Sequence, residues 1–396
     1  MLDQMFKIQD KCSKSKARLA ELSLLHGKVQ TPIFLPVGSQ ATVRALTPQD
    51  LEEIGIRMIL CNSYHLYLRP GVDIIEKAGG LHKFMAWDKP ILTDSGGYQI
   101  FSLSSFRKIT SDGVRFRSHI DGSEHSISPE YAVSLQEKLG ADIIMVLDVC
   151  PESMAKKEQL AGAVAYTTEW ADRCFRSHKD NGQLLFGIIQ GGLMPELRKL
   201  SAEQITSIDF PGYAIGGLNL GESKSSMWET VDHTVELMPE NKPRYLMGVG
   251  SPEDVVDGIG RGIDIFDSAL PTRVARNGAF YTRHGRKNIK HAVFGDKFEP
   301  IEDSCGCFTC RNFTQAYLHH LFKCEELLAY RLATIHNLFF MNTLISEIHE
   351  SIDKGQFPAF REKFMATYKT SDEYKRIEQK IRSIESKRKK GDEGFS

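Results

Sequence analysis

Residues Gly262 to Gly278 read GIDIFDSALPTRVARNG, and this segment is the clearest guide to the architecture of the chain. The apolar run from Ile263 to Leu270 predicts a buried strand, which a turn containing Pro271 follows. Asp267 lies near the carboxyl end of the run, where α/β enzymes keep their reactive groups. A second acid, Asp264, lies earlier in the run, so we expect position along the strand to separate their roles.

Two arginines, Arg273 and Arg276, follow the run within a turn or two. An acid that can attack a carbon, next to cations that can hold a phosphate backbone, indicates chemistry on a sugar of a nucleic acid. The alternative is an ordinary solvated strand end.

Short apolar runs with helical patterns between them recur along the chain. Together with the run at Ile263–Leu270 there are eight of them, the others being Thr31–Val37, Arg57–Asn62, Pro90–Asp94, Asp142–Asp148, Leu184–Gln190, Tyr213–Leu218 and Arg244–Val249. Eight such units predict a (β/α)8 TIM barrel, whose active site is built at the carboxyl ends of the strands. A doubly wound open sheet fits the same alternation and stays the alternative.

Helix starts and insertions complete the predicted layout. Thr47-Pro48, Ser128-Pro129 and Ser251-Pro252 each pair a capping hydroxyl with a proline suited to a first helical turn. We predict a catalytic barrel over residues 1–300 with a β-hairpin insertion near 101–127. A zinc-binding helical subdomain packed on the barrel is predicted over 301–385, and a disordered basic tail over 386–396.

Composition restricts the class of protein. The formal net charge is −1, so a nucleic-acid surface has to be a local patch rather than a global excess. No signal-peptide pattern and no long apolar stretch occur in the sequence, so we expect no membrane partner and a cytoplasmic location. Three of the eight cysteines crowd between Cys305 and Cys310, which favours reduced thiols plus a metal site over disulfides.

The cysteine cluster predicts a metal centre. Cys305, Cys307 and Cys310, joined by an imidazole from a later helix, can complete a closed, structural Cys3His zinc site. His336 is one candidate for the imidazole, although His319 and His320 are nearer in sequence. The alternative is three unliganded cysteines in a loop.

Polar and small residues end several of the apolar runs. The segment Thr93–Gln99, with Asp94, two glycines and Tyr98, suits the close approach and stacking of a flat ligand, or else forms a tight turn into a helix. Asp148, Gln190 and the Gly216-Gly217 pair end the next three runs. A carboxylate, an amide and backbone N–H groups on one rim can read the edge of a purine.

Later segments indicate contacts with phosphate and with a partner. Gly248 and Gly250, after Met247, can cradle phosphate, but Glu253 breaks a dinucleotide fingerprint. The following region is rich in cations with aromatic residues between them, which suits RNA or a solvated hairpin. The stripe of Phe313, Tyr317 and His320 on one helical face is either core or a subunit contact.

These motifs together resemble the tRNA-guanine transglycosylases, also called queuine tRNA-ribosyltransferases, in their bacterial form. The resemblance covers nearly the whole chain, through TPIFLPVGSQATV, DSGGYQIFSL, GIIQGG, IGGLNLGE, YLMGVG, FDSALPTRVARNG and the Cys-x-Cys-x-x-Cys segment. It implies a TIM barrel with a zinc subdomain, one structural Zn²⁺ per subunit and a homodimer. It also implies exchange of guanine at wobble position 34 in GUN-anticodon tRNAs (Asp, Asn, His, Tyr), with the tRNA anticodon stem-loop as partner.

The resemblance assigns roles by position. Asp267 is similar to the family's nucleophile, which forms a covalent ribosyl-aspartate intermediate, and Asp94 to its general acid/base; this agrees with the two-carboxylate logic of retaining glycosidases. Substrate contacts are implied for Asp94, Ser95, Gly96, Gly97, Tyr98, Asp148, Cys150, Gln190, Gly217, Leu218 and Met247. RNA contacts are implied for Gly248, Val249, Gly250, Ser251, Pro252, Glu253, Asp254, Thr272, Arg273, Val274, Ala275 and Arg276. The zinc ligands implied are Cys305, Cys307, Cys310 and His336.

The incoming base is expected to be 7-aminomethyl-7-deazaguanine (preQ1). Cys150 matches the cysteine that suits the small aminomethyl group, while Leu220 stands where we associate valine with the family. A bulkier aliphatic side chain should admit preQ1 and hinder the cyclopentenediol of queuine. The alternatives are direct queuine insertion and a catalytically silent RNA-binding subunit, which the presence of both aspartates disfavours; a zinc-containing glycoside hydrolase lacks support because no tryptophan platform is evident. An archaeal-type enzyme is disfavoured because no extra C-terminal RNA-binding domain is evident.

Overall fold

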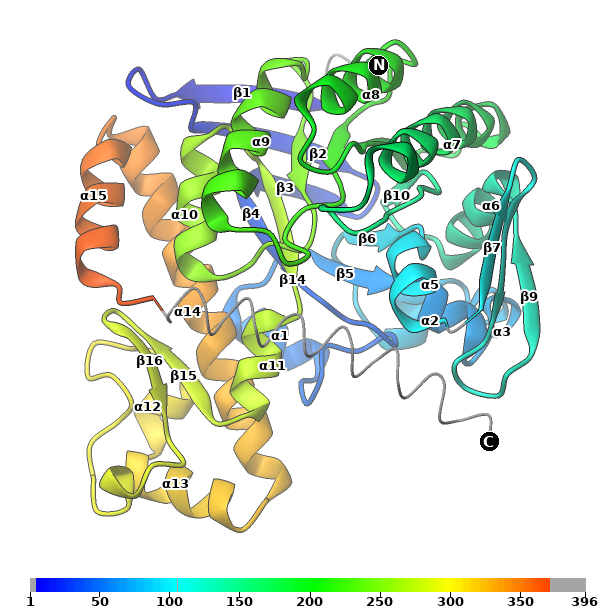
Figure 1. The fold of residues 1–396 in the computed structure, drawn as a ribbon. Helices are drawn as coiled ribbons and strands as arrows, with labels where there is room; N and C mark the ends of the chain where they lie inside the picture. Colours follow the sequence, from blue (N-terminus) through cyan, green and yellow to red (C-terminus); the bar gives the residue numbers. More distant parts are fainter. Residues whose placement is uncertain (1–4, 105, 371–396) are drawn as a thin grey trace.

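The computed structural model describes residues 5–104 and 106–370 and is built around a parallel eight-stranded sheet (Figure 1). The strands are β4 (Ile33–Pro36), β5 (Ile59–Asn62), β6 (Ile91–Asp94), β10 (Ile143–Met145), β11 (Leu184–Ile189), β12 (Tyr213–Ile215), β13 (Arg244–Leu246) and β14 (Ile265–Ser268). Each lies within one of the eight predicted apolar runs. Their near-continuous burial is what a parallel sheet covered by helices requires.

The sheet curls into a nearly closed barrel. The first strand, β4, pairs in parallel with the last, β14, from Ile33 opposite Ile265 to Pro36 opposite Ser268. Between β4 and β5 the closure is a single parallel bridge, Val37 to Leu60, with the Gly38 N–H donating to the Leu60 carbonyl at 2.6 Å. Pairing of the first strand with the last confirms the (β/α)8 prediction and excludes the open doubly wound sheet.

Helices follow the strands and lie around the barrel (Figure 1). They are α1 (Pro48–Ile54), α2 (Ser63–Leu68), α3 (Val72–Lys77), α4 (Leu81–Met85), α5 (Gly97–Leu103), α6 (Pro129–Leu139), α7 (Lys157–Ser177), α8 (Pro195–Thr206), α9 (Lys224–Glu236), α10 (Pro252–Gly260) and α11 (Leu270–Arg276). Thr47 and Ser128 cap α1 and α6 by accepting a backbone N–H, as predicted. Ser251 differs, because its hydroxyl donates to Asp254 Oδ2 at 2.5 Å and makes no side-chain cap bond to the backbone.

An antiparallel sheet that the sequence reading did not anticipate precedes the barrel. It consists of β1 (Phe6–Lys11), β2 (Arg18–Leu24) and β3 (Gly27–Thr31). Arg18 on β2 forms a bidentate ion pair with Asp264, with Nε and Nη2 at 2.9 and 2.6 Å from the carboxylate oxygens, and both side chains are buried. The earlier acid of the opening segment is therefore structural, and it lies just before β14.

A second antiparallel sheet follows α5. It contains β7 (Arg107–Thr110), β8 (Gly113–Arg117) and β9 (Glu124–Ile127), and the turn at Asp121-Gly122 joins β8 to β9. Trp170 and Arg173 of α7 donate to the carbonyl of Ser111 and hold the β7–β8 turn against the barrel helices.

The C-terminal part has its own apolar core. It contains β15 (Ala279–Thr282), β16 (Gly285–Asn288), a 3-10 turn (Ala292–Phe294), α12 (Phe308–Asn312), α13 (Gln315–Lys323), α14 (Leu327–Asp353) and α15 (Phe357–Thr367). The long helix α14 packs on α11, α1 and β4 of the barrel and also on α12 and β15 (Figure 1). Phe280 and Ile289 pack in this second core together with residues of α12, α13 and α14. The predicted tail, 386–396, lies outside the described residues.

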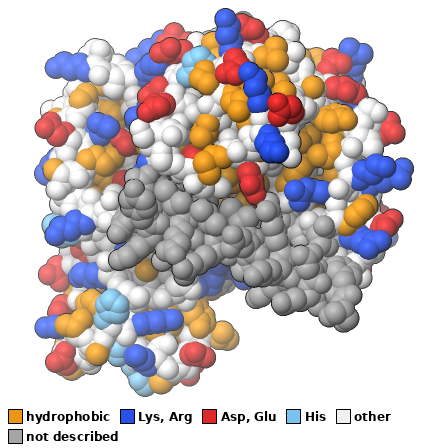
Figure 2. Space-filling view, viewed as in Figure 1, with side chains coloured by type: hydrophobic (Ala, Val, Ile, Leu, Met, Phe, Trp, Pro, Cys, Tyr) orange, Lys and Arg blue, Asp and Glu red, His pale blue; other side chains and the backbone are white. Residues whose placement is uncertain are grey.

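Charges of both signs are interspersed on the face shown in Figure 2, in keeping with the net charge of −1. None of the helices in the described ranges has the length and hydropathy needed to cross a membrane.

Candidate active site and metal centre

Asp267, near the carboxyl end of β14, is held through one of its two carboxylate oxygens. Oδ1 accepts hydrogen bonds from the Tyr245 hydroxyl at 2.6 Å and from the Gly248 N–H at 2.7 Å. Among the described residues no hydrogen bond reaches Oδ2. Burial raises the pKa of Asp267, and these two hydrogen bonds oppose the rise.

Asp94, at the end of β6, is held at both oxygens. Oδ1 accepts the Ser63 N–H at 2.9 Å, while Oδ2 accepts the side-chain amides of Asn62 and of Gln99, the latter at 2.7 Å. Burial raises the pKa of Asp94 to about 6, the three hydrogen bonds oppose this, and the charge of Asp267 adds to the rise. The charge of Asp267 thus acts on Asp94, and both acids lie at the same end of the barrel.

A second polar group forms between β6, β10 and β11. Asp148 accepts the Ser95 hydroxyl at 3.1 Å and the Gln190 side-chain amide at 2.7 Å, and burial raises its pKa. Glycines make the arrangement possible, because a Cβ on Gly97 would lie 2.6 Å from Asp148 Oδ1, and one on Gly217 would lie 2.4 Å from Gln190 Oε1.

The remaining predicted base contacts lie on the same rim. Cys150 and Leu218 are buried, Met247 is half-buried, and Tyr98 is exposed at the start of α5. Although part of the Tyr98 side chain is exposed, its hydroxyl end is buried, and this burial raises its pKa; the Cys150 thiol adds to the rise and Arg273 opposes it, which places these groups near one another. Gly96 has φ +80, and a Cβ there would meet Tyr64 at 3.1 Å.

The two predicted RNA segments are mostly turned inward. Val249, Gly250, Ser251, Pro252, Glu253, Asp254, Thr272 and Ala275 are buried, whereas Gly248 and Arg273 are exposed and Val274 and Arg276 are half-buried. The Lys224 ammonium lies 3.0 Å from a Glu253 oxygen and 2.7 Å from an Asp254 oxygen. The side chains available to a ligand are therefore chiefly the two arginines.

A third arginine, Arg44, lies near Arg273 and Arg276. Burial lowers the pKa of Arg276, and the neighbouring charges of Arg44 and Arg273 lower it further. One terminal nitrogen of Arg276 is buried without a hydrogen-bond partner among the described residues. Such a local cluster is the kind of patch that a chain of near-zero net charge needs in order to bind a polyanion.

The four predicted metal ligands converge. The sulfur atoms of Cys305, Cys307 and Cys310 lie 3.8, 3.5 and 3.3 Å from Nδ1 of His336. Nε2 of His336 lies 2.7 Å from the Tyr281 carbonyl, which leaves Nδ1 for a metal. All four ligand atoms lie within 4.8 Å of one another, so the cluster fits a structural metal site.

His319 and His320 take no part in this centre. His319 Nδ1 lies 2.7 Å from the Ile289 carbonyl, and His320 lies beside Cys324. Spacing in the sequence could not decide among the three histidines, because the two nearer ones lie on α13 and contact Ile289 and Cys324 instead of the three cysteines.

Another histidine cluster lies away from the two catalytic candidates. His26 and His82 stack with their ring centroids 3.5 Å apart and an interplanar angle of 17°. Asp142 accepts from the His26 and Ile91 N–H groups, both at 2.8 Å. A metal has to lie near the plane of each imidazole that binds it, so nearly parallel stacked rings are poorly placed to share one. We interpret this cluster as a hydrogen-bonded link between the N-terminal sheet and the barrel.

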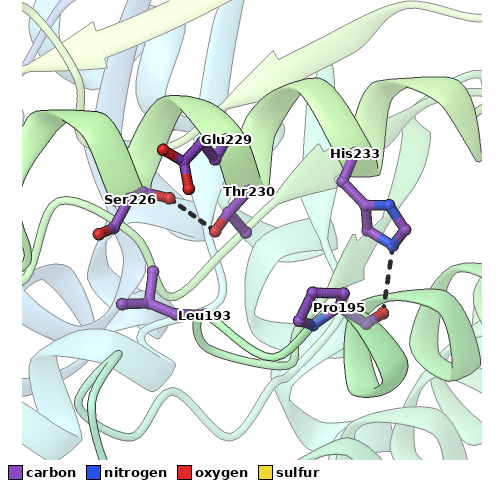
Figure 3. A pocket seen from close by; sticks show the side chains of 6 residues that line it. All are labelled: Leu193, Pro195, Ser226, Glu229, Thr230 and His233. Carbon is purple, nitrogen blue, oxygen red and sulfur yellow. Dashed lines mark hydrogen bonds between the residues drawn. The ribbon is translucent and has the colours of Figure 1, made fainter.

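A shallow cavity of about 180 Å³ lies between the loop before α8 and helix α9. Figure 3 shows Leu193 and Pro195 facing Ser226, Glu229, Thr230 and His233 across it, with the His233 ring bonded to the Pro195 carbonyl. None of these six residues belongs to the predicted site.

Several residues that shape the site were not predicted from the sequence. Asn62 ends a predicted apolar run, so the rule that found Asp94 and Asp148 could also have found it. Tyr245 lies inside β13 and Gln99 inside α5, where nothing in the local pattern distinguishes them from core or surface residues.

An α/β barrel with two buried acids at its strand ends, a polar slot beside them and arginines at the rim fits the class of glycosyl-transfer enzymes. Comparisons with known proteins give the family. The family model for queuine tRNA-ribosyltransferase matches residues 12–370. The chain therefore belongs to the queuine tRNA-ribosyltransferase family.

Relatives named queuine tRNA-ribosyltransferase resemble it over nearly their full length. The protein from Dehalococcoides mccartyi strain BAV1 is 58% identical over 379 residues, which is 96% of this chain and 97% of the relative. Those from Pelotomaculum thermopropionicum and Thermoanaerobacter sp. strain X514 are 53% and 52% identical, covering 92% and 93% of this chain and 98% and 99% of their own.

Proposed function

We propose that this enzyme replaces guanine at wobble position 34 of GUN-anticodon tRNAs with preQ1, through a covalent bond between ribose and Asp267. The observation that carries the proposal is the difference between the two acids. Within the described parts of the chain, one oxygen of Asp267 accepts no hydrogen bond, while Asp94 accepts hydrogen bonds at both oxygens and has its pKa raised to about 6.

This difference supports a division of labour. A carboxylate nucleophile needs a lone pair directed at carbon, which Oδ2 of Asp267 offers. A group that moves protons works best with a pKa near the working pH, which favours Asp94. The donors on Oδ1 of Asp267 keep part of its charge in place while the other oxygen reacts.

The two half-reactions then balance. Oδ2 of Asp267 bonds to ribose C1′ as the C1′–N9 bond breaks, the electron pair goes to guanine N9, and Asp94 supplies a proton to the leaving base. In the second half, Asp94 accepts the proton of preQ1 N9, the nitrogen bonds to C1′, and the carboxylate of Asp267 leaves. Two inversions give net retention.

The polar slot supports recognition of a purine. The carboxylate of Asp148 can accept from the ring N–H and the exocyclic amine, while Gln190 and the Gly217 N–H can donate to the carbonyl oxygen. Tyr98 and Met247 are available to cover the two ring faces. Cys150, Leu218 and Leu220 border the place of the 7-substituent, and the size of Leu220 favours preQ1 over queuine.

The rim, the metal centre and an exposed aromatic pair support the proposed RNA partner, metal ion and homodimer in turn. Arg273 and Arg276 would hold phosphates flanking the extruded nucleotide of the anticodon stem-loop. Zinc suits the four ligands, because bonds of about 2.3 Å to sulfur and about 2.0 Å to nitrogen place tetrahedral ligands about 3.5 Å apart. The stacked rings of Phe313 and Tyr317, with Tyr317 exposed, offer a surface for a homodimer.

The test is incorporation of labelled guanine into unmodified tRNA, followed by chase with preQ1 or queuine. We expect exchange of guanine, displacement by preQ1, and slower use of queuine. Faster use of queuine would refute the choice of base alone. Binding of tRNA without any exchange would instead identify a silent RNA-binding subunit.

A further inference from the structure

Arg198 is a fully buried cation in an unfavourable place. It lies in the first turn of α8 with 0% of its surface exposed. The positive end of the helix dipole and the loss of hydration both oppose a charge there. Burial lowers the pKa of Arg198 to about 10, so the guanidinium stays protonated at neutral pH. A residue kept against these costs needs strong compensating contacts.

Those contacts are three main-chain carbonyls at the ends of β11 and β12. Nε donates to Gly192 at 2.8 Å, Nη1 to Ile189 at 2.9 Å and Nη2 to Gly216 at 2.8 Å. No carboxylate in the described parts of the chain forms an ion pair with Arg198. Its hydrogen bonds are therefore all made to peptide carbonyls, while the nearby carboxylate of Glu222 acts on its charge without forming an ion pair.

Two of these carbonyls belong to the peptide units that carry the base-reading groups. The Ile189 carbonyl is part of the unit whose N–H is that of Gln190, and this N–H donates to Ser201 of α8 at 3.0 Å. The Gly216 carbonyl is part of the unit whose N–H is that of Gly217. Fixing a carbonyl fixes the direction of the N–H on the opposite side of the same planar unit.

The charge of Arg198 also acts through the peptide unit between Gly216 and Gly217. A cation bound to a peptide oxygen polarises the amide and makes its N–H a stronger donor, more so where water is excluded. From these contacts we propose that Arg198 is a positioning residue that sets recognition of the 6-oxo group of the base, through the Gly217 N–H and the Gln190 side chain. The inference rests on the proposed function, which has these two groups donating to that oxygen.

A purely structural role predicts something different. Arg198 also holds Gly192, so its loss would loosen the loop before α8 and lower stability. It would then weaken binding of all purines equally. A positioning role weakens only the contact with the atom at position 6.

The probes are guanine and 6-thioguanine, which share the edge facing Asp148 and differ at position 6, where sulfur accepts hydrogen bonds weakly. Equilibrium dialysis of labelled guanine, with 6-thioguanine as competitor, gives the ratio of the two dissociation constants. The variants are Arg198→Lys, which keeps the charge but not the three-way geometry, and Arg198→Met, which keeps the volume.

Arg244→Lys is the matched control. Arg244 is also buried, with 7% of its surface exposed, its pKa is lowered to about 10 by burial, and it donates to the Met238 carbonyl, but it lies at the amino end of β13. Its substitution should lower stability and leave the ratio of dissociation constants unchanged.

For the wild type we expect guanine to bind about tenfold more tightly than 6-thioguanine. In both Arg198 variants guanine affinity should fall about tenfold while 6-thioguanine affinity changes less, and the KM for tRNA should stay within about twofold. If Met at this position prevents folding, the Lys variant alone decides. An unchanged ratio in folded variants overturns the inference but leaves the proposed function standing. A wild type that does not distinguish the two bases refutes the proposed reading of the base.

Discussion

The Tyr245 hydroxyl donates a 2.6 Å hydrogen bond to Oδ1 of Asp267, and the Gly248 N–H joins it on the same oxygen at 2.7 Å. Tyr245 lies in β13, which pairs in parallel with β14, and Gly248 lies in the turn that follows β13. Pairing of β13 with β14 therefore directs both donors to Oδ1, and Oδ2 is the oxygen that the proposed function has bonding to ribose.

Replacing Tyr245 with Phe should shift the pH dependence of exchange. The Tyr245 hydrogen bond lowers the pKa of Asp267, so its loss raises that pKa, and a higher pH is then needed to ionise the nucleophile. We expect about tenfold lower kcat at pH 6 and a smaller loss at pH 8, measured by guanine exchange. Tyr213→Phe, another buried hydroxyl on a barrel strand, is the control; identical acidic limbs in wild type and Tyr245→Phe would contradict the assignment.

Asp94→Asn should alter the pH dependence of stability. The folded pKa of Asp94 is raised to about 6, above its unfolded value, so its contribution favours folding at low pH and is lost as the pH rises through 6. Between pH 8 and pH 5 the wild type should gain about 1 kcal/mol more than Asp94→Asn. Chemical denaturation at the two pH values measures this. Parallel stability curves would show that Asp94 is not held in the manner described.

Cys307→Ser should lower both the metal content of the protein and its unfolding free energy. The sulfur is buried in the ligand cluster, so its loss opens a closed site and releases the link between the 305–310 loop and α14. We expect less than one zinc per chain by elemental mass spectrometry and a loss of about 3 kcal/mol or more in unfolding free energy. Cys324→Ser, an exposed cysteine, should change neither quantity. A Cys307 variant of normal stability that fails only in turnover would argue for a catalytic metal.

Asp148→Asn should weaken binding of the base and leave binding of the tRNA nearly unchanged. The carboxylate accepts from Ser95 and Gln190, and an amide can present only one acceptor where the purine edge needs two. Guanine affinity should fall about tenfold to a hundredfold, with the KM for tRNA nearly unchanged. Equal losses for both substrates would indicate a general collapse of the rim instead.

Much of the fold and part of the site could be predicted because their signals are local. Each barrel strand is an apolar run, and Asp94, Asp148 and Asp267 stand at or near the ends of such runs, where the barrel geometry gathers them. The three cysteines are close in sequence. Of the four metal-ligand candidates, only His336 comes from a distant helix.

The rest depends on long-range contacts that leave no local pattern. Arg198 reads as a solvated residue of an amphipathic helix, yet it is buried against two strand ends. Tyr245 reads as core, although its hydroxyl reaches the nucleophile candidate. The N-terminal sheet was missed because charged and polar residues interrupt its strands, so that they form no continuous apolar run like those of the barrel. Its buried ion pair left no local pattern either, since Arg18 and Asp264 are separated by the whole barrel in sequence.

The proposed function requires a covalent bond between Asp267 and ribose. Wild-type enzyme mixed with an unmodified anticodon stem-loop RNA, quenched in denaturant and analysed by gel and by mass spectrometry of the digested protein, should give an RNA adduct on the peptide that contains Asp267. Asp267→Asn should bind the RNA with similar affinity and give no adduct. An adduct on Asp94, or exchange of guanine by Asp267→Asn at the wild-type rate, would contradict the account.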